Sequence, residues 1–175
     1  DEYAGLPGRR YDALECYRAD DAEVVFVMLG SFATKAKAAV DQLRQAGRPV
    51  GLVRPRLLRP FPEADLRRAL AGKVAVAVID QNLSIGKGGV LHGEISGALH
   101  GVSGAPPVIA SFIGGLGGRD ITAEEFFEIA GQTARAAESG QVPPPRLLYT
   151  LHELAEMRKL QAIAHVERQE EVPGP

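Results

Sequence analysis

The sequence VAVAVIDQNLSIGKGG, residues 74–89, decides the fold of this chain. Its first six residues are apolar and rich in β-branched side chains, which is typical of a short strand buried on both faces. Asp80 ends the apolar run, and a polar loop with three glycines follows it. Because strands of this type lie inside sheets that helices cover, residues 74–79 are predicted to form a strand at the centre of a core.

Strand and helix patterns alternate on both sides of this stretch. The short apolar runs are β-branched, whereas the longer segments between them carry apolar residues at helical spacing. This alternation predicts an α/β fold with a mostly parallel sheet. Residues 11–18 fit a period of two only loosely and are interpreted as an edge strand. The other expected strands cover residues 23–29, 50–53 and 107–113, and the expected helices cover residues 32–46, 62–71, 89–100, 123–138 and 147–170.

Some residues of the expected helices carry positional meaning. Thr122 followed by Glu125 matches a capping box, which is a strong signal for the start of a helix. Ser31 is the expected N-cap of the first helix. Gly93 and Gly97 lie four residues apart, and we interpret them as positions where a neighbouring element packs closely.

Length and composition favour one compact domain. The chain has 175 residues, of which 45% are hydrophobic, and its 20 basic and 22 acidic residues are mixed along the sequence. This mixture leaves no electrostatic footprint for nucleic acid or an anionic membrane, so neither is an expected partner. The chain has no apolar run long enough to span a membrane and no signal-peptide pattern, so we expect a cytoplasmic protein.

The expected organisation has three parts. Residues 1–10 form a lead-in segment, residues 11–140 form the domain, and residues 141–175 combine a proline spacer with a C-terminal helical tail. The chain starts at Asp1 without a methionine, which is consistent with a piece of a longer chain. Its single cysteine, Cys16, excludes an internal disulfide and is interpreted as a reduced thiol in the core or at an interface.

Polar residues follow the central strand at the place where open α/β sheets usually meet ligands or partner subunits. These residues are Asp80, Gln81, Asn82 and Ser84. The glycines after them either let the chain turn with positive φ or mark contact with a partner, and both interpretations stand here. A second glycine-rich turn occupies residues 114–120.

Three arginines follow the strand at residues 50–53. Arg54, Arg56 and Arg59 are interleaved with prolines and can hold a phosphate or a carboxylate. We favour a solvated loop in which they pair with acidic residues of a neighbouring subunit.

Known catalytic and nucleotide-binding motifs do not match. The second glycine turn departs from G-x-G-x-x-G at its last position and follows the last strand instead of the first, and no P-loop precedes Lys87. His152 and Glu153 begin like a zinc-protease helix, but Glu156 stands where the second histidine is needed. The histidines are scattered, so we assign no catalytic residue and no metal site.

Four motifs occur along the chain in the order Gly30-Ser31, Arg59-Pro60-Phe61-Pro62, Ile79-Asp80-Gln81-Asn82-Leu83-Ser84, and Gly115-Leu116-Gly117-Gly118-Arg119-Asp120-Ile121-Thr122. As a set they resemble the alpha subunit of 2-oxoacid:ferredoxin oxidoreductases, and pyruvate:ferredoxin oxidoreductase in particular. The resemblance covers residues 11–130 and departs from the family at Ile85-Gly86-Lys87, where a proline and an aromatic residue are expected.

The resemblance implies a domain like the C-terminal domain of transketolase. This is a three-layer α/β/α fold with a mostly parallel five-stranded sheet whose first strand is antiparallel. The family's enzymes decarboxylate a 2-oxoacid on thiamine diphosphate, pass electrons through iron-sulfur clusters to ferredoxin, and release an acyl-coenzyme A. This chain lacks the thiamine motif and a cysteine cluster. Thiamine diphosphate, magnesium, the iron-sulfur clusters and coenzyme A are therefore expected elsewhere in the whole enzyme, with none held by this chain.

The implied role is a non-catalytic assembly or scaffold domain of the alpha component, acting on pyruvate or another 2-oxoacid. Its expected partners are the thiamine-binding and iron-sulfur components, and ferredoxin indirectly. Asp80, Asn82, Arg119 and Asp120 are the expected contacts, because carboxylates and guanidinium groups at strand ends form charge-assisted pairs across interfaces. Arg119 has a second possible partner in a phosphate of coenzyme A. The associated loop glycines are Gly86, Gly88, Gly89, Gly115, Gly117 and Gly118.

Two other functions fit the sequence. One is a stand-alone module for a small anionic ligand, with the loops after Asp80 and Gly114 as its floor. The other is the matching domain of a different thiamine enzyme, such as a transketolase or an oxoacid dehydrogenase beta subunit.

Overall fold

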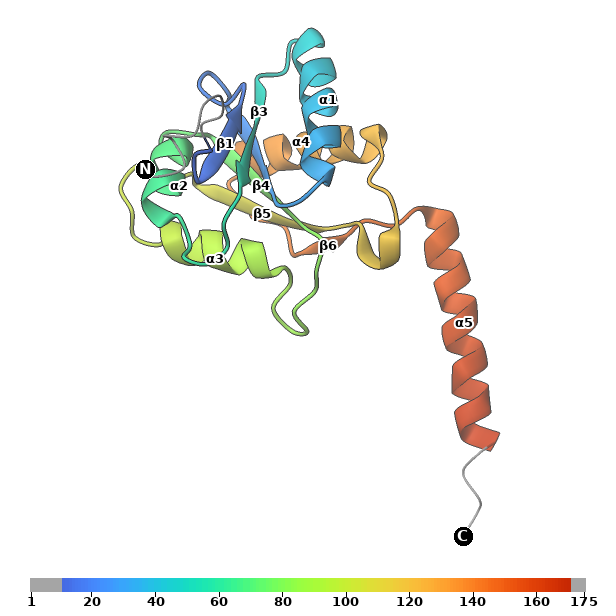
Figure 1. The fold of residues 1–175 in the computed structure, drawn as a ribbon. Coiled ribbons are helices and arrows are strands. Elements are labelled where there is room, and N and C mark those ends of the chain that lie inside the picture. Colours follow the sequence, from blue (N-terminus) through green and yellow to red (C-terminus); the bar gives the residue numbers. More distant parts are fainter. Residues whose placement is uncertain (1–10, 171–175) are drawn as a thin grey trace.

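The structure is a computed structural model that describes residues 11–170. The lead-in segment expected at residues 1–10 and the last residues, 171–175, lie outside the described residues. Within residues 11–170, six strands form one sheet in the order β1-β3-β2-β4-β5-β6 (Figure 1). The strands are β1 Leu14–Tyr17, β2 Val24–Met28, β3 Val50–Pro55, β4 Ala75–Asp80, β5 Val108–Ile113 and β6 Arg146–Leu147. The α-helices are α1 Phe32–Gln45, α2 Glu63–Leu70, α3 Val90–Leu99, α4 Ala123–Ser139 and α5 Leu151–Glu170.

The sheet confirms the predicted α/β class. Strand β1 pairs antiparallel with β3, and the other neighbours pair parallel, so the antiparallel first strand is also confirmed. Strand β4 lies in the middle, and all six of its residues are buried. The long apolar run at residues 74–79 therefore marks the centre of the sheet.

The predicted number of strands, five, is wrong because β6 adds a sixth. Arg146 and Leu147 pair with the end of β5. The N–H of Leu148 then donates to the carbonyl oxygen of Ile113 at 2.8 Å, and the Leu148 side chain is buried in the core. Two residues are too few to show a strand period, so the sequence contains no pattern for this strand.

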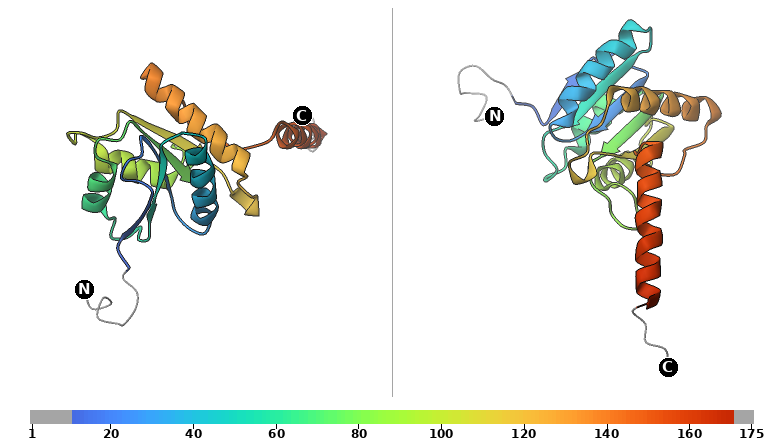
Figure 2. Two further views of the ribbon diagram at one scale, coloured as in Figure 1. Left: turned by 90° about the horizontal axis from the view of Figure 1, so that it is seen from above. Right: turned by 90° about the vertical axis from the view of Figure 1, so that its right-hand side faces the viewer.

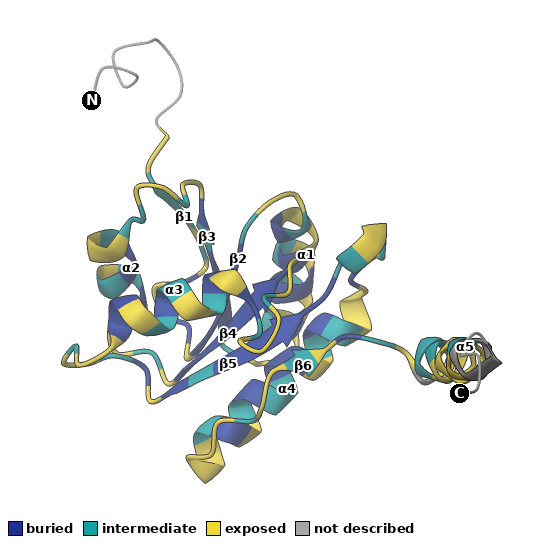
Figure 3. Cartoon of the chain, turned by 90° about the horizontal axis from the view of Figure 1, so that it is seen from below, coloured by how far each residue is buried: buried dark blue, intermediate teal, exposed yellow. Residues whose placement is uncertain are grey.

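Two pairs of helices cover the two faces of the sheet (Figures 1 and 2). Helices α1 and α4 pack on one face, where Phe26 of β2 and Phe126 of α4 have ring centroids 5.8 Å apart. Helices α2 and α3 pack on the other face against alternate residues of β2 and β4, including Val25 and Val78. Figure 3 shows the consequence: β2, β3, β4 and β5 are buried almost throughout, and the exposed residues lie on the outer sides of the helices and in the loops. The edge strands β1 and β6 are only partly buried.

The helix signals are confirmed at α4 and wrong at two other places. The Thr122 hydroxyl accepts the N–H of Glu125 at 3.3 Å, and the Glu125 carboxylate accepts the N–H of Thr122 at 2.9 Å. Ser31 makes no capping hydrogen bond within the described chain, because its own backbone is already helical. No described atom lies within 4 Å of a Cβ placed at Gly93 or Gly97, so close packing there is wrong: both residues face outward.

Helix α5 projects away from the rest of the molecule (Figures 1 and 2). The helix expected from residue 147 begins instead at Leu151, because Leu147 belongs to β6 and Thr150 caps the first turn. The Thr150 hydroxyl accepts the N–H of Glu153 at 3.1 Å, and the Glu153 carboxylate accepts the N–H of Thr150 at 2.7 Å. Helix α5 has 20 residues, but no helix in the described part of the chain is long and apolar enough to cross a membrane.

Candidate functional site

The predicted contact residues lie at the carboxyl edge of the parallel strands. Asp80 is the last residue of β4 and is 2% exposed. Its carboxylate accepts the N–H of Leu91 at 2.8 Å and the N–H of His92 at 3.1 Å. Asp80 therefore caps the N-terminal turn of α3, where the helix dipole favours a negative charge.

Burial and hydrogen bonding act in opposite directions on this carboxyl group. Burial raises the pKa of Asp80, and the backbone N–H groups of Leu91 and His92 limit the rise because they favour the ionised form. The net shift is upward. Asp80 is thus a structural acid enclosed by the fold.

Gly89 is required by the position of Asp80. A Cβ at residue 89 would lie 1.9 Å from an oxygen of the Asp80 carboxylate, a distance that no real contact permits. The backbone of Gly89 is extended with a φ of −78°, so the constraint is one of space. Gly86 and Gly88 have φ values of 79° and 84°, and they turn the loop back on itself through a bridge between Ser84 and Gly88.

Asn82 completes the cap on α3. Its side-chain oxygen accepts the N–H of Val90 at 3.0 Å. Together with the two bonds to Asp80, this satisfies the N–H groups of three successive residues, 90–92. The start of α3 therefore has no free donors at these positions for an anionic ligand, which argues against the module with this loop as its floor.

Arg119 is occupied by two acidic residues of the same chain. Its guanidinium group lies 2.8 Å from the carboxylate of Glu125 in α4 and 2.6 Å from the carboxylate of Glu153 in α5. Hydrogen bonding to Glu153 and Glu125 raises the pKa of Arg119, and the reciprocal bond from Arg119 lowers the pKa of Glu153 to about 2. Arg119 therefore joins the first turn of α4 to the first turn of α5.

Asp120 makes a different internal contact. Its carboxylate pairs with Lys35 of α1 and accepts the N–H of Ile121 at 2.9 Å. The hydrogen bond from Lys35 lowers the pKa of Asp120. Asp120 thus ties the second glycine turn to α1.

The second glycine turn lies beside the first. Gly115, Gly117 and Gly118 all have positive φ. A Cβ at Gly115 would lie 3.3 Å from the ring of Phe32 and 3.4 Å from the side chain of Gln81. Gln81 also donates to the carbonyl oxygen of Leu29 at 3.3 Å, so one amide side chain lies between the ends of β2, β4 and β5.

Large apolar side chains are also exposed at this edge, beside the exposed polar residues Asn82 and Asp120. Ile85 is 95% exposed at the tip of the first loop, and Leu83 and Val90 are also exposed. Leu160, Ile163 and Val166 are exposed along α5. Asp80, Asn82, Arg119 and Asp120 were sequence candidates because they are polar. Of the exposed apolar residues on this loop, Ile85 was noted in the sequence as a departure from the family pattern, whereas Leu83 and Val90 were not candidates.

Arg54 near the end of β3 and Arg56 and Arg59 after it pair within the chain, contrary to the expectation of acids from a neighbouring subunit. Arg54 and Arg56 lie 3.3 and 3.5 Å from the carboxylate of Glu15, and Arg59 lies 2.6 Å from that of Glu94. The reason is the antiparallel pairing of β1 with β3, which sets Glu15 directly opposite Arg54.

No metal centre is assembled by the described side chains within residues 11–170. The described histidine, cysteine and acidic side chains form no group of three that could hold a metal ion. A ring nitrogen of His92 lies 3.2 Å from the carbonyl oxygen of Ile109, and Glu153 is held by Arg119. Cys16 is exposed on β1, so a position in the core is wrong, and the alternative position at an interface stays a prediction.

A sheet with two layers of helices and two glycine loops at its carboxyl edge defines this domain as an α/β domain of the three-layer class. Comparison with known proteins then identifies its family. Residues 22–126 match the model of the pyruvate:ferredoxin oxidoreductase core domain II. The chain belongs to this family.

Its relatives are subunits of larger proteins. The chain is 38% identical over 138 residues to pyruvate synthase subunit PorA of Methanothermobacter thermautotrophicus, covering 79% of this chain and 35% of the relative. It is 40% identical over 132 residues to ketoisovalerate oxidoreductase subunit VorA of Pyrococcus furiosus, covering 75% and 33%. It is 42% identical over 125 residues to PorA of Thermotoga maritima, covering 71% and 32%. The chain thus spans about a third of the length of these relatives.

One solved structure is also similar. It is a 2-oxoglutarate:ferredoxin oxidoreductase from Magnetococcus marinus, and the match has 24% identity and a TM-score of 0.49. The match covers 75% of this chain and 20% of the other.

Proposed function

We propose that this chain is a non-catalytic assembly domain in the alpha component of a 2-oxoacid:ferredoxin oxidoreductase. The family match over residues 22–126 carries the proposal. The relatives named as pyruvate synthase and ketoisovalerate oxidoreductase subunits support a 2-oxoacid as the substrate of the whole enzyme. In that enzyme the 2-oxoacid is decarboxylated, ferredoxin accepts the electrons, and an acyl-coenzyme A is released.

The surface at the carboxyl edge supports assembly as the role. Its polar candidates have partners inside the chain, and its exposed side chains include large apolar ones. Clustered apolar residues on a surface are typical of protein contacts. The expected contributions of Asp80, Asn82, Arg119 and Asp120 to an interface are then indirect: Asp80 and Asn82 hold the loop that presents Ile85, and Arg119 and Asp120 hold the elements around it.

The cofactors of the whole enzyme belong to other parts of it in this proposal. An iron-sulfur cluster needs about four cysteine thiolates, and this sequence has one cysteine. The residues of this chain therefore do not fit such a cluster, and no step of the reaction is assigned to them. Thiamine diphosphate, magnesium, the clusters and coenzyme A are proposed to bind the partner domains or subunits, in the cytoplasm.

The division of the chain follows from the same role. Residues 11–140 are proposed as the domain proper and residues 141–175 as the spacer and helical tail, although the spacer also adds β6 and the buried Leu148 to the domain. Helix α5 is proposed as a second surface for a partner. Exposed apolar residues in the helical tail, including Leu160 and Ile163, support this assignment.

Recovery of the assembled enzyme tests the proposal. The tagged chain is expressed in its native host and recovered, its partners are identified by mass, and the material is assayed for 2-oxoacid-dependent reduction of a dye. We expect a thiamine-binding subunit and a cysteine-rich subunit, together with activity. Recovery of a folded chain alone and without activity contradicts the proposal.

A matched pair of variants locates the contact. Ile85→Asp places a charge at the tip of the loop and is expected to lower partner recovery about tenfold, since a buried unpaired charge costs an interface more than 1.4 kcal/mol. Val142→Asp changes an equally apolar exposed residue beyond the far end of α4 and is expected to leave recovery unchanged. Equal recovery of both variants contradicts a contact at Ile85.

A further inference from the structure

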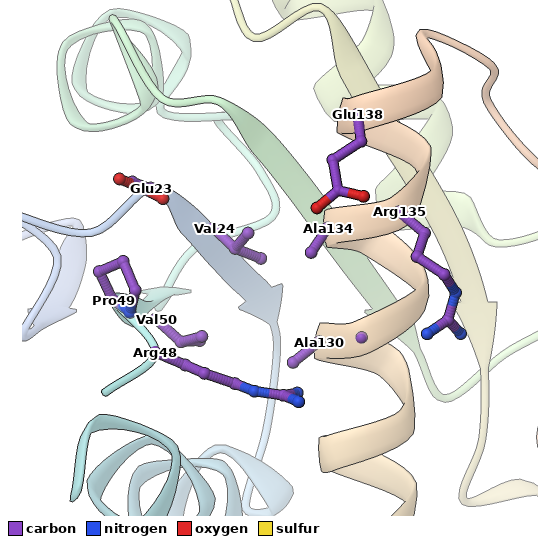
Figure 4. Close-up of a pocket in the computed structure, with 10 residues that line it drawn as sticks. Glu23, Val24, Arg48, Pro49, Val50, Ala130, Ala134, Arg135 and Glu138 are labelled. Atoms are coloured by element: carbon purple, nitrogen blue, oxygen red, sulfur yellow. The ribbon is translucent and has the colours of Figure 1, made fainter. Parts of the chain in front are cut away.

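A hollow lies at the amino edge of the sheet, opposite the loops described above. It has a volume of about 310 Å³ and lies between the first residues of β2 and β3 and the middle of α4 (Figure 4). Val24, Val50, Ala130 and Ala134 form its apolar floor. The name "amino-edge hollow" denotes this site, whose charged residues are Glu23, Arg48, Arg135 and Glu138.

The guanidinium groups of two exposed arginines flank one point beside the amino-edge hollow. A Cβ placed at Gly131 of α4 would lie 3.4 Å from a terminal nitrogen of Arg135 and 3.9 Å from a terminal nitrogen of Arg48. Figure 4 shows Arg48 reaching from the start of β3 toward Ala130. Because residue 131 is glycine, the space between the two groups is not filled by a side chain.

Neither guanidinium group has an acidic partner in the described part of the chain. Glu23 and Glu138 line the same hollow, yet neither forms an ion pair with Arg48 or Arg135 within residues 11–170. This is unusual for the molecule, because most arginines with described side chains are paired. The paired arginines are Arg18, Arg44, Arg54, Arg56, Arg59, Arg67, Arg68, Arg119 and Arg146.

Two unpaired cations at one point repel each other, and an oxyanion between them removes that repulsion. Guanidinium groups present several N–H donors in a planar fork that matches carboxylate and phosphate oxygens. We propose that Arg48 and Arg135 bind the carboxylate or phosphate group of a small ligand, whose short apolar part lies on the floor of the amino-edge hollow.

The acidic residues of the hollow restrict the ligand to one anionic group. In Figure 4 the carboxylates of Glu23 and Glu138 lie in the upper part of the view, and the Arg48 guanidinium lies in the lower part. A second negative charge on the ligand would approach these carboxylates and be repelled. A short monocarboxylate fits this arrangement better than a polyanion does. The site is independent of the function proposed above, because it uses none of the same residues.

Titration of the ¹⁵N-labelled chain, followed by NMR, tests the site. The probes are butyrate, inorganic phosphate and chloride, all at constant ionic strength, since exposed charge pairs weaken with salt. Butyrate is expected to give saturable shifts at Arg48, Gly131 and Arg135 with a dissociation constant of about 1 mM. Chloride is expected to give none. Absence of saturable shifts at these residues up to about 50 mM butyrate overturns the proposal.

Variants separate a built site from general positive charge. Arg48→Ala and Arg135→Ala are each expected to weaken butyrate binding about tenfold, since each removes charge-assisted hydrogen bonds. Gly131→Leu fills the gap and is expected to weaken binding similarly while both charges remain. Arg158→Ala removes an exposed arginine of α5 that has no acidic partner in the described chain, and it serves as the matched control. Equal weakening in this control overturns the proposal.

The anionic group has two conceivable sources, and the same variants distinguish them. Saturable binding of butyrate or phosphate identifies a free ligand. Weak binding of both probes, combined with loss of a partner subunit in the Arg48→Ala/Arg135→Ala chain, identifies a carboxylate on that partner. If neither butyrate nor phosphate binds saturably, the oxyanion site is overturned, whether or not a partner subunit is lost.

Discussion

The two edges of the sheet use their charged residues in opposite ways. At the carboxyl edge, Asp80 and Arg119 are conspicuous in the sequence, and both form bonds within the chain. At the amino edge, Arg48 and Arg135 belong to no motif, yet both converge on Gly131 without an acidic partner in the described chain. In this chain the residues of the sequence motifs hold the backbone in place. The candidate site for an outside molecule was found from charged groups that have no partner in the described chain.

The largest expected effect concerns the packing of Gly89 on Asp80. Gly89→Ala would place a Cβ 1.9 Å from the carboxylate oxygen, so the Asp80 side chain must move and lose both backbone bonds. We expect a loss of about 4 kcal/mol in the free energy of unfolding. Urea denaturation measures it, and Gly93→Ala, which has open space around it, is the matched control and is expected to be neutral or slightly stabilising. Equal stability of Gly89→Ala and the parent chain contradicts this account of the carboxyl edge.

The next effect isolates the capping bonds of Asp80. Asp80→Ala leaves the N–H groups of Leu91 and His92 without their acceptor, and we expect a loss of about 2 kcal/mol. Because Asn82 is exposed and accepts one bond, Asn82→Ala is expected to cost only about 0.5 kcal/mol. Urea denaturation of both variants checks the order. A larger loss for Asn82→Ala than for Asp80→Ala refutes the assignment of Asp80 as the main cap.

A smaller and local effect concerns the attachment of α5. The pKa of Glu153 falls from its ordinary value of 4.5 to about 2 because Arg119 favours the ionised form. A lowered pKa means that the contribution is complete above about pH 4.5 and is lost as the pH falls toward 2. The protection factors of amides in the first turn of α5, which correct for the intrinsic pH dependence of exchange, are therefore expected to fall across this range. In Arg119→Gln, these protection factors are expected to be low already at pH 6, and an unchanged pH profile in that variant rules out the ion pair as the cause.

The smallest effect belongs to the amino edge. Arg48→Ala and Arg135→Ala are each expected to change the free energy of unfolding by less than about 0.5 kcal/mol, because neither removes an ion pair. A gain in stability from either variant would strengthen the contrast between the two edges, since it would reveal repulsion between the two guanidinium groups. A loss above about 2 kcal/mol would contradict that contrast, because the arginines would then stabilise the fold. Thermal and urea denaturation without added anions measure the difference.

Short-range chemistry made much of the fold predictable. The strand at residues 74–79 is recognisable because both of its faces are apolar, and the start of α4 is recognisable because Thr122 and Glu125 lie three residues apart. Each signal is contained within one element. Of the two interpretations of the loop glycines, the structure bears out a turn with positive φ for Gly86 and Gly88, whereas Gly89 has an extended backbone and is required by space.

The pairing of distant residues was not predictable from one sequence. Arg119 and Glu153 are 34 residues apart, and Arg48 and Gly131 are separated by most of the domain. Which acid neutralises which arginine depends on strand order and helix placement, and the sequence alone offers several acids for each. Residue type suggested Arg119 as available for a partner, whereas the end of β6 brings Glu153 to it first.

The attachment of α5 has a mechanical consequence. The helix is 20 residues long, which corresponds to about 30 Å at the usual rise per residue. A tilt of about 10° at its first turn moves its far end by about 5 Å. The guanidinium group of Arg119 holds the first turn of α5. A sub-ångström adjustment of this side chain therefore becomes a larger displacement of any partner bound at the far end of the helix.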